Sequence, residues 1–297
     1  MNSVLEKIKA FSFEFNETIK VYFEKPEGHE KRTVEAMEYA VLNGGKRIRP
    51  FLVTECAKLF GANKEKAFEA AAALEMLHTY SLIHDDLPAM DNDDLRRGKP
   101  TCHKAFDEAT AILAGDGLLT YAFEVLASSG YKEDVKIKLI ELLAKGAGAF
   151  KGMIAGQTLD LYAENVKEEK EPLKLIENIE KMKTGCLLKY ACEAGAIVGG
   201  AGQKELEALR VYARKIGQTF QISDDILDVV GDEKKVGKTL KKDDAQNKLT
   251  FVSVLGLEKA RKIEEQLTAE AKEALKIFGD KAETLENLAD FIISRDY

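Results

Sequence analysis

Residues 74–98 carry a dense block of carboxylates directly after an apolar helical pattern. Leu74, Leu77 and Leu82 recur at helical spacing, and the stretch then runs into Asp85, Asp86, Asp91, Asp93 and Asp94. Carboxylates this close together repel one another unless they are solvated, protonated or neutralised by cations. A solvated acidic loop is the simpler interpretation of most such stretches. The apolar run before the block, with Arg96 and Arg97 after it, favours a divalent metal beside an anion such as a phosphate ester.

A second acidic block continues an apolar stripe in residues 203–230. Apolar side chains recur there every three or four residues, and polar ones extend the same stripe at Gln221, Asp224 and Asp228, with Asp225 beside them. The arrangement repeats that of the first block. It predicts two acidic clusters that face each other across one cavity.

Basic residues are grouped in a glycine-rich joint between two predicted helices. Lys46, Arg47 and Arg49 follow Gly44 and Gly45, so backbone N–H groups and cationic side chains can converge there on phosphate oxygens. A solvated turn explains these residues equally well. His78 lies seven residues before Asp85, on the same helix face and about 10.5 Å away. A lone helical histidine is usually a satisfied core residue, but its place below a carboxylate cluster favours a ligand.

Two further segments contain polar residues that need a separate interpretation. Gln157 and Asp160 in GQTLDL can line the cavity or make structural contacts. The segment GDEKKVGKT (231–239) nearly matches a nucleotide phosphate loop, but five residues separate its glycines where four are needed and no β-strand precedes it. We therefore reject nucleotide binding and keep Lys238 as a cation near the second acidic cluster.

The composition indicates one continuous, all-helical unit over residues 1–297. The chain has five prolines, no Ser/Gly tract and no long run with strand periodicity. Helices are expected over 1–23, 30–42, 64–87, 131–164, 173–198, 203–230, 248–276 and 281–295. Two more are expected, one starting at Pro50 and one running from after Pro100 to about residue 127.

Charge and hydropathy exclude several classes of protein. The net charge of −7, without a basic tail, argues against nucleic-acid binding. The sequence has no uninterrupted apolar run of about 18 residues, so we expect no membrane span. The first residues also lack a secretory signal's apolar centre. We therefore expect a cytoplasmic protein. The four cysteines lack paired spacing and are expected to be reduced and mostly buried.

Taken together, the motifs resemble those of trans-isoprenyl diphosphate synthases, in particular the short-chain bacterial farnesyl diphosphate synthase type. They cover nearly the whole chain in the family's order: GGKRIRP (44–50), HDDLPAMDNDDLRRG (84–98), GQTLDL (156–161), KTG (183–185), FQISDDILD (220–228) and Lys238. The resemblance implies an antiparallel helical bundle around a deep central cavity, a homodimer, and about three Mg²⁺ ions that hold an allylic diphosphate.

The resemblance also assigns roles to individual residues. It implies that metal is bound by Asp85, Asp91 and Asp224, with Asp86 in support. It places the allylic diphosphate and the reacting cation beside Arg96, Lys183, Thr184, Gln221 and Lys238. It places isopentenyl diphosphate, bound without metal, beside Lys46, Arg49, His78 and Arg97.

The implied reaction is ionisation of the allylic diphosphate, attack by isopentenyl diphosphate and loss of a proton, which needs no side-chain nucleophile. Helix geometry places Ser81 most directly beneath Asp85, whereas the family credits an aromatic residue at the position of Tyr80 with stopping growth at fifteen carbons. We expect farnesyl diphosphate as the product. The alternatives are a geranylgeranyl diphosphate synthase, a class I terpene cyclase, which does not need the second diphosphate site, and a non-catalytic partner subunit, which tends to lose one Asp-rich motif.

Overall fold

The computed structural model describes residues 2–166, 168–230 and 249–294. In the first half of the chain the helices are α1 (Asn2–Thr18), the 3-10 helix η1 (Ile19–Tyr22), α2 (Lys31–Val41), α3 (Ile48–Lys58), α4 (Lys64–Asp85), α5 (Cys102–Ala105) and α6 (Glu108–Ser128). The later ones are α7 (Glu133–Ala147), α8 (Met153–Asn165), α9 (Pro172–Lys183), α10 (Gly185–Gly199), α11 (Gln203–Val230), α14 (Phe251–Leu255), α15 (Leu257–Leu275), the 3-10 helix η2 (Lys276–Ala282) and α16 (Glu283–Ser294). Within these ranges the only strands are two residues long, β1 (Leu95–Arg96) and β2 (Lys99–Pro100). The predicted all-α bundle is confirmed.

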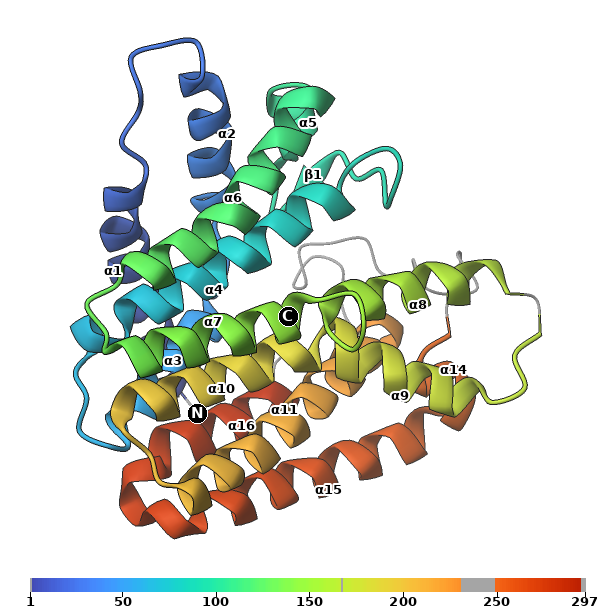
Figure 1. Cartoon of the computed structure of the whole chain (residues 1–297). Coiled ribbons are helices and arrows are strands. Elements are labelled where there is room, and N and C mark those ends of the chain that lie inside the picture. The colour runs from blue at the N-terminus through green and yellow to red at the C-terminus, as the bar shows by residue number, and fades with distance from the viewer. Residues whose placement is uncertain (1, 167, 231–248, 295–297) are drawn as a thin grey trace.

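Helix α4 is the centre of the bundle. It packs against α3, α6 and α10, and α10 in turn packs against α11, which is followed by α15 and α16 (Figure 1). Asn63 caps α4, because its side chain accepts a hydrogen bond from the backbone N–H of Lys66 at 2.9 Å. Apolar and small side chains on nearly every face of α4 are buried, as expected of a helix enclosed by others.

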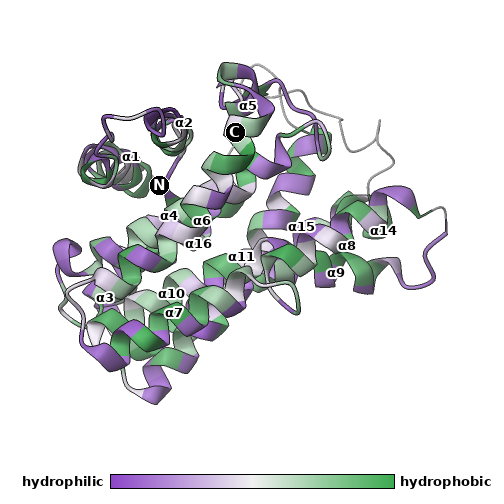
Figure 2. Cartoon of the chain, turned by 45° about the horizontal axis from the view of Figure 1, so that its top comes forward, coloured by the Kyte–Doolittle hydropathy of each residue, from purple (hydrophilic) through white to green (hydrophobic). Residues whose placement is uncertain are grey.

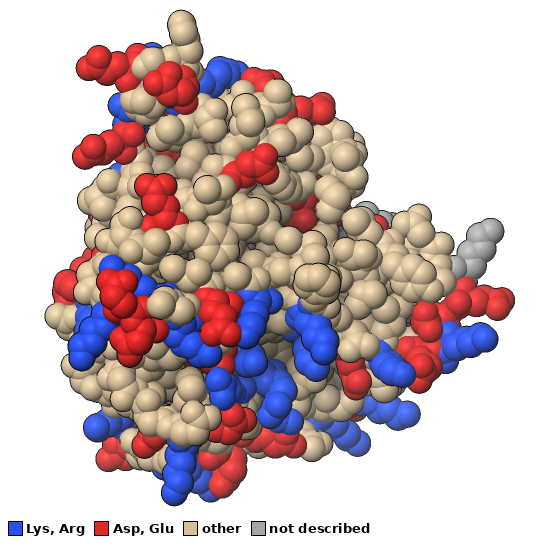
Figure 3. All heavy atoms as spheres, in the orientation of Figure 1, with Lys and Arg blue, Asp and Glu red and all other residues tan. Residues whose placement is uncertain are grey.

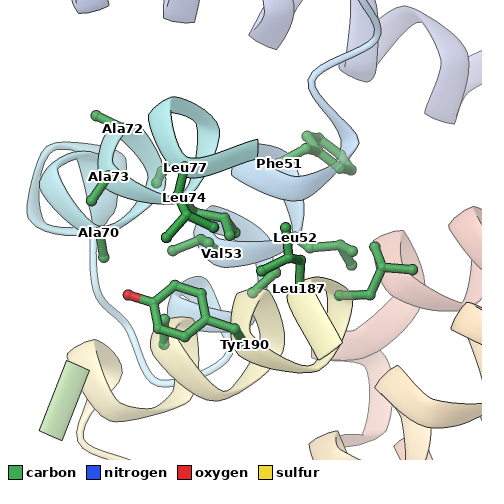
Figure 4. Packing of buried hydrophobic residues seen from close by; sticks show 14 of the residues in the cluster. Phe51, Leu52, Val53, Ala70, Ala72, Ala73, Leu74, Leu77, Leu187 and Tyr190 are labelled. Carbon is green, nitrogen blue, oxygen red and sulfur yellow. The ribbon is translucent and has the colours of Figure 1, made fainter. Parts of the chain in front are cut away.

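The hydrophobic core lies where α3, α4 and α10 meet. In Figure 4, Leu52 of α3 and Leu74 and Leu77 of α4 point toward Leu187 and Tyr190 of α10. All five are fully buried or nearly so. Figure 2 shows α6 and α10 mainly in the hydrophobic colour. This core fixes the α4 backbone that carries Asp85 at its last residue.

Four predicted helices are each split in two. The stretch after Pro100 forms α5 and α6, because Asp107 caps a new helix by accepting from the Thr110 N–H at 2.8 Å. Residues 131–164 form α7 and α8, and the described part of the predicted helix 248–276 forms α14 and α15 on either side of Gly256, whose φ is +80°. The stretch 173–198 breaks between α9 and α10 at Thr184. The short β1–β2 hairpin was also not predicted.

Helix α6 is long and apolar enough, by length and composition alone, to cross a membrane. It is the only such helix among the described residues. Its buried positions pack against α4 and α2, and core helices commonly pass the same test. The four cysteines are free, and three of them are buried, as predicted. A single domain over 1–297 stays a prediction.

Candidate active site

A cavity of about 560 Å³ opens beside the C-terminal half of α4. Six of its lining residues come from that helix: His78, Tyr80, Ser81, Leu82, His84 and Asp85. Its far wall contains apolar side chains of α6 and α8, among them Leu119, Ile154 and Leu161. The volume is within the range of small-molecule sites. The cavity therefore combines the carboxylates of Asp85 and Asp116 with apolar side chains.

The loop after α4 folds back on the helix end, as predicted. The backbone N–H of Asp91 donates to the carbonyl of Asp85 at 2.8 Å. Burial raises the pKa of Asp85 to about 6; Lys183 opposes this rise, and the charges of Asp91 and Asp86 add to it. The end of α4 thus holds negative charge that a cation would stabilise.

Asp86 points into a different environment from Asp85. It is 3% exposed and accepts hydrogen bonds from Nε and Nη2 of Arg96 at 2.8 and 2.6 Å. Hairpin β1–β2 presents this arginine. Asp86 lines a small separate pocket with Arg96 and Arg97, so its partner in this structure is a guanidinium. The ion pair orients Arg96 beside the acidic loop.

A second cavity of about 240 Å³ adjoins the first, and the two share Arg49 and His78. It brings together all four residues that the resemblance assigned to the metal-free diphosphate: Lys46, Arg49, His78 and Arg97. An Arg49 Nη1 atom lies 3.3 Å from Nε2 of His78. Burial and the nearby Arg49 and Arg97 hold the pKa of His78 well below its usual value. The histidine is therefore neutral beside a cluster of guanidinium groups.

Two further features make the second cavity suitable for an anion. Nε of Arg49 is buried and finds no hydrogen-bond partner within the described part of the chain. Desolvation, together with the charges of Arg47 and Arg96, lowers the pKa of the Arg97 guanidinium to about 10. Desolvation is the largest of these causes, although the side chain is partly exposed. Arg97 Nη1 donates to the carbonyl of Gly44. A bound diphosphate would relieve this concentration of positive charge.

The junction between α9 and α10 places Lys183 and Thr184 on the wall of the first cavity. Lys183 Nζ lies 2.5 Å from Oδ2 of Asp160 on α8. The close contact of α8 with the end of α9 requires Gly156, since a Cβ there would lie 2.1 Å from the backbone nitrogen of Lys183. Asp160, Lys183, Thr184 and Gln221 also surround a smaller pocket.

The second Asp-rich motif lies on α11, which extends over Gln203–Val230 as predicted. Asp224 lines the second cavity rather than the first. Asp225 accepts from the backbone N–H of Phe251 at 2.8 Å, which ties α11 to α14, and from Nε2 of Gln221 on its own helix at 3.1 Å. Lys238 lies outside the described residues.

The two acidic motifs do not form a ready-made metal centre. Within the described ranges, no three His, Cys, Asp or Glu side chains come close enough together to hold a metal ion by themselves. Mg²⁺ in enzymes is often held by one or two carboxylates together with substrate phosphates. Asp85 and Asp91 therefore fit a metal that binds along with a diphosphate.

Sequence reasoning missed two ion pairs beside the cavities. The sequence allows Asp160 either a cavity role or a structural one and does not predict its pairing with Lys183. It does not predict the buried pair of Arg47 and Glu75, 2.6 Å apart, either. Glu75 lies three residues before His78, on the same side of the helix. This spacing was the signal in the sequence that Glu75 lies near the residues predicted to bind diphosphate.

Comparison with known proteins agrees with this geometry. Residues 30–289 match the polyprenyl synthetase family. The chain is 47% identical to the farnesyl diphosphate synthase of Escherichia coli over 270 residues, or 89% of each chain. It is 45% identical to geranylgeranyl pyrophosphate synthase 4 of Arabidopsis thaliana over 264 residues, which is 89% of this chain and 71% of the other. A crystal structure of an FPP/GFPP synthase from Zymomonas mobilis superposes with a TM-score of 0.88 at 40% identity, covering 98% of this chain and 99% of that one.

The chain therefore belongs to the polyprenyl synthetase family. The family resemblance seen in the motifs is confirmed, and with it the enzyme class, a prenyltransferase. Members of this family depend on divalent metal.

Proposed function

We propose that this prenyltransferase condenses isopentenyl diphosphate with dimethylallyl or geranyl diphosphate and releases (2E,6E)-farnesyl diphosphate and diphosphate. The observation that carries the proposal is the pair of adjoining cavities that share Arg49 and His78. One cavity combines apolar side chains with Asp85 and Lys183, and the other is rich in cationic side chains. Two diphosphates, one attached to a growing apolar chain, match the two cavities.

Asp85 and Asp91 are our proposed ligands of Mg²⁺ from the first motif, and Asp224 is the proposed ligand from the second. Their support is chemical: oxygen ligands suit this ion, and Asp85 resists ionisation without a neighbouring cation. When bound, about three Mg²⁺ ions would stabilise the negative charge of the departing diphosphate.

The chain's own groups then have distinct tasks. Lys183 and Thr184 bind the allylic diphosphate oxygens, with Arg96, Gln221 and Lys238 as further predicted contacts. The allylic carbon–oxygen bond breaks, and diphosphate leaves with its electron pair. Apolar side chains such as Leu119 and Leu161 exclude water, which would otherwise trap the cation as an alcohol.

The second substrate binds in the cationic cavity. Lys46, Arg49, His78 and Arg97 hold isopentenyl diphosphate so that its double bond faces the allylic cation. Its π electrons form the new carbon–carbon bond, and the adjacent proton passes to the released diphosphate. Preorganised cations and alignment of the two substrates supply most of the rate enhancement.

Product length is set in the first cavity. Both Tyr80 and Ser81 line it, and Tyr80 is 5% exposed with its ring edge against His84, 5.7 Å between centroids. This bulk supports Tyr80 as the barrier to growth beyond fifteen carbons. Geranylgeranyl diphosphate is the second candidate product, favoured by the comparable identity to synthases of that name.

Neither a terpene cyclase nor a non-catalytic subunit fits the site as well. A class I terpene cyclase needs no second diphosphate cavity, and five basic or imidazole residues, Arg47 among them, line one here. A non-catalytic partner subunit tends to lose an Asp-rich motif, whereas both are present in this chain.

We further propose a cytoplasmic homodimer. Support for the homodimer comes from α6, on which Ile112 and Leu113 are 45% and 56% exposed. Figure 3 shows a broad area with few charged side chains where Figure 1 places this helix. Apolar patches of this kind commonly mark interfaces between proteins.

The deciding experiment is an incubation with radiolabelled isopentenyl diphosphate, Mg²⁺ and, in turn, dimethylallyl, geranyl or farnesyl diphosphate, followed by chromatography of the dephosphorylated products. We expect fifteen-carbon farnesol from the first two starters and little elongation of the third. A dominant twenty-carbon alcohol would favour geranylgeranyl diphosphate as the product. Cyclic hydrocarbons formed without incorporation of label would refute the proposal.

A further inference from the structure

Arg47 is buried at a point where three helices meet. Its side chain is completely inaccessible to solvent. Nε donates to Oδ1 of Asn16 on α1 at 2.8 Å, Nη1 donates to Oε1 of Glu75 on α4 at 2.6 Å, and Nη2 donates to the carbonyl of Val41 at the end of α2. All three guanidinium nitrogens are therefore used inside the protein.

The backbone of Arg47 is held in an uncommon conformation. Its φ of 52° lies in the left-handed region, where few non-glycine residues are found. Such a conformation persists only when surrounding contacts impose it. Arg47 immediately precedes α3, so its conformation sets the direction in which the loop enters that helix. Its neighbours Lys46 and Arg49 both line the cationic cavity.

Glu75 brings a negative charge to the same cavity. It lines that cavity and is only 2% exposed, and its charge acts on both Arg49 and Arg97. A buried carboxylate without a partner would oppose the binding of any anion nearby. The ion pair with Arg47 neutralises it at a distance of 2.6 Å.

We propose that Arg47 is a positioning residue for the diphosphate in the cationic cavity and does not itself bind that ligand, because its guanidinium is fully buried and each of its nitrogens already donates inside the protein. It sets the loop that carries Lys46 and Arg49, and it neutralises Glu75. The inference rests on the proposed function, because it takes isopentenyl diphosphate as the ligand there.

The test compares Arg47→Gln, Arg47→Lys, Glu75→Gln and the double variant Arg47→Gln/Glu75→Gln in steady-state kinetics with geranyl diphosphate as the second substrate. For Arg47→Gln we expect the KM for isopentenyl diphosphate to rise by about tenfold or more, equivalent to about 1.4 kcal/mol or more, while the KM for geranyl diphosphate changes little. The double variant should recover much of this loss, because the unpaired carboxylate is gone. Arg47→Lys should recover only part, since an ammonium group cannot reproduce the three-way fork.

Several results would overturn the inference. One is a double variant no better than Arg47→Gln; another is a rise of both KM values in proportion to a fall in melting temperature. If Arg47→Gln does not fold, Glu75→Gln alone carries the test: an unchanged or lower KM for isopentenyl diphosphate supports the role, and a tenfold higher one contradicts it. Calorimetric titration of isopentenyl diphosphate without metal, on wild type and variants, measures the same effect independently of turnover. A wild type that binds it but forms no product would refute the proposed function and leave this inference standing.

Discussion

Asp160 and Lys183 form an ion pair of 2.5 Å between α8 and α9 at the wall of the first cavity. The pair holds the lysine that we assign to the allylic diphosphate. In Asp160→Asn the amide keeps the shape but loses the charge, so Lys183 is less firmly placed. We expect kcat/KM for the allylic substrate to fall by roughly tenfold, or about 1.4 kcal/mol. Glu171→Gln is the matched control, because it breaks the exposed pair with Lys174; equal kinetics in the two variants would contradict the role.

Asp85 should make the metal-free protein less stable as the pH rises. Burial raises its pKa from the usual 3.8 to about 6, so between these values the folded state binds more protons than the unfolded chain. Stability from this group is full below about pH 4 and is lost as the pH rises through 6. Asp85→Asn should therefore be more stable than wild type at pH 7, by about 1–2 kcal/mol after allowing for partial exposure, and not at pH 4.

Thermal unfolding in a chelator at both pH values measures this difference, with the exposed Asp94→Asn as control. The same Asp85→Asn variant should lose turnover by orders of magnitude, because a proposed metal ligand is gone. Mg²⁺ with a non-reactive allylic diphosphate analogue should stabilise wild type more than the variant. A variant no more stable than wild type at pH 7 would show that burial does not destabilise this carboxylate.

Tyr80→Ala should lengthen the product. Removing the ring from a wall of the cavity opens space along the chain's path, so twenty-carbon and longer alcohols should appear in the product chromatogram. Tyr162→Ala is a suitable control, since Tyr162 is an exposed aromatic residue of α8 outside the cavity lining. A product profile that stays at fifteen carbons would remove Tyr80 as the barrier and leave Ser81 as the candidate.

Arg97→Ala should act mainly on the second substrate. Its guanidinium belongs to the cationic cavity, and one charged hydrogen bond to a diphosphate contributes about 1.5–3 kcal/mol. We expect the KM for isopentenyl diphosphate to rise by roughly 10- to 100-fold, with kcat and the allylic KM nearly unchanged. Lys99→Ala, in the same hairpin, serves as control. Unchanged kinetics in Arg97→Ala would refute its assignment.

Leu113→Asp should weaken the proposed dimer. A carboxylate on the exposed apolar side of α6 would have to be desolvated in an interface there. Sedimentation velocity at several concentrations should show a larger share of monomer than for wild type. Val21→Asp, another exposed apolar position, provides the comparison. If the two variants sediment alike, α6 is not the interface.

Long helices with a continuous pattern were predictable from the sequence. For α4 and α11 the apolar spacing continues for many turns, and the polar residues at their ends fall on the same stripe, so both helices and both Asp-rich motifs were found. The return of Asp91 toward Asp85 was predicted as well, since Pro88 interrupts the helix between them.

The breaks between helices could not be predicted in the same way. At Thr184 the helical pattern continues in the sequence, and the break depends on how α9 and α10 pack against α8 and α11. The ion pairs of Asp160 with Lys183 and of Arg47 with Glu75 join residues 23 and 28 positions apart. Helical periodicity placed Glu75 on the side of α4 that carries His78, but it identifies no partner on another element for either pair.

The glycine at position 156 links the spacing of two helices to recognition of a head group. Because the missing side chain leaves room for the backbone of Lys183 itself, even a single added methyl would push away the whole turn that presents this lysine. A change of that kind would alter no charge and remove no hydrogen-bonding atom. In an assay it would nevertheless look like the loss of a phosphate-binding residue.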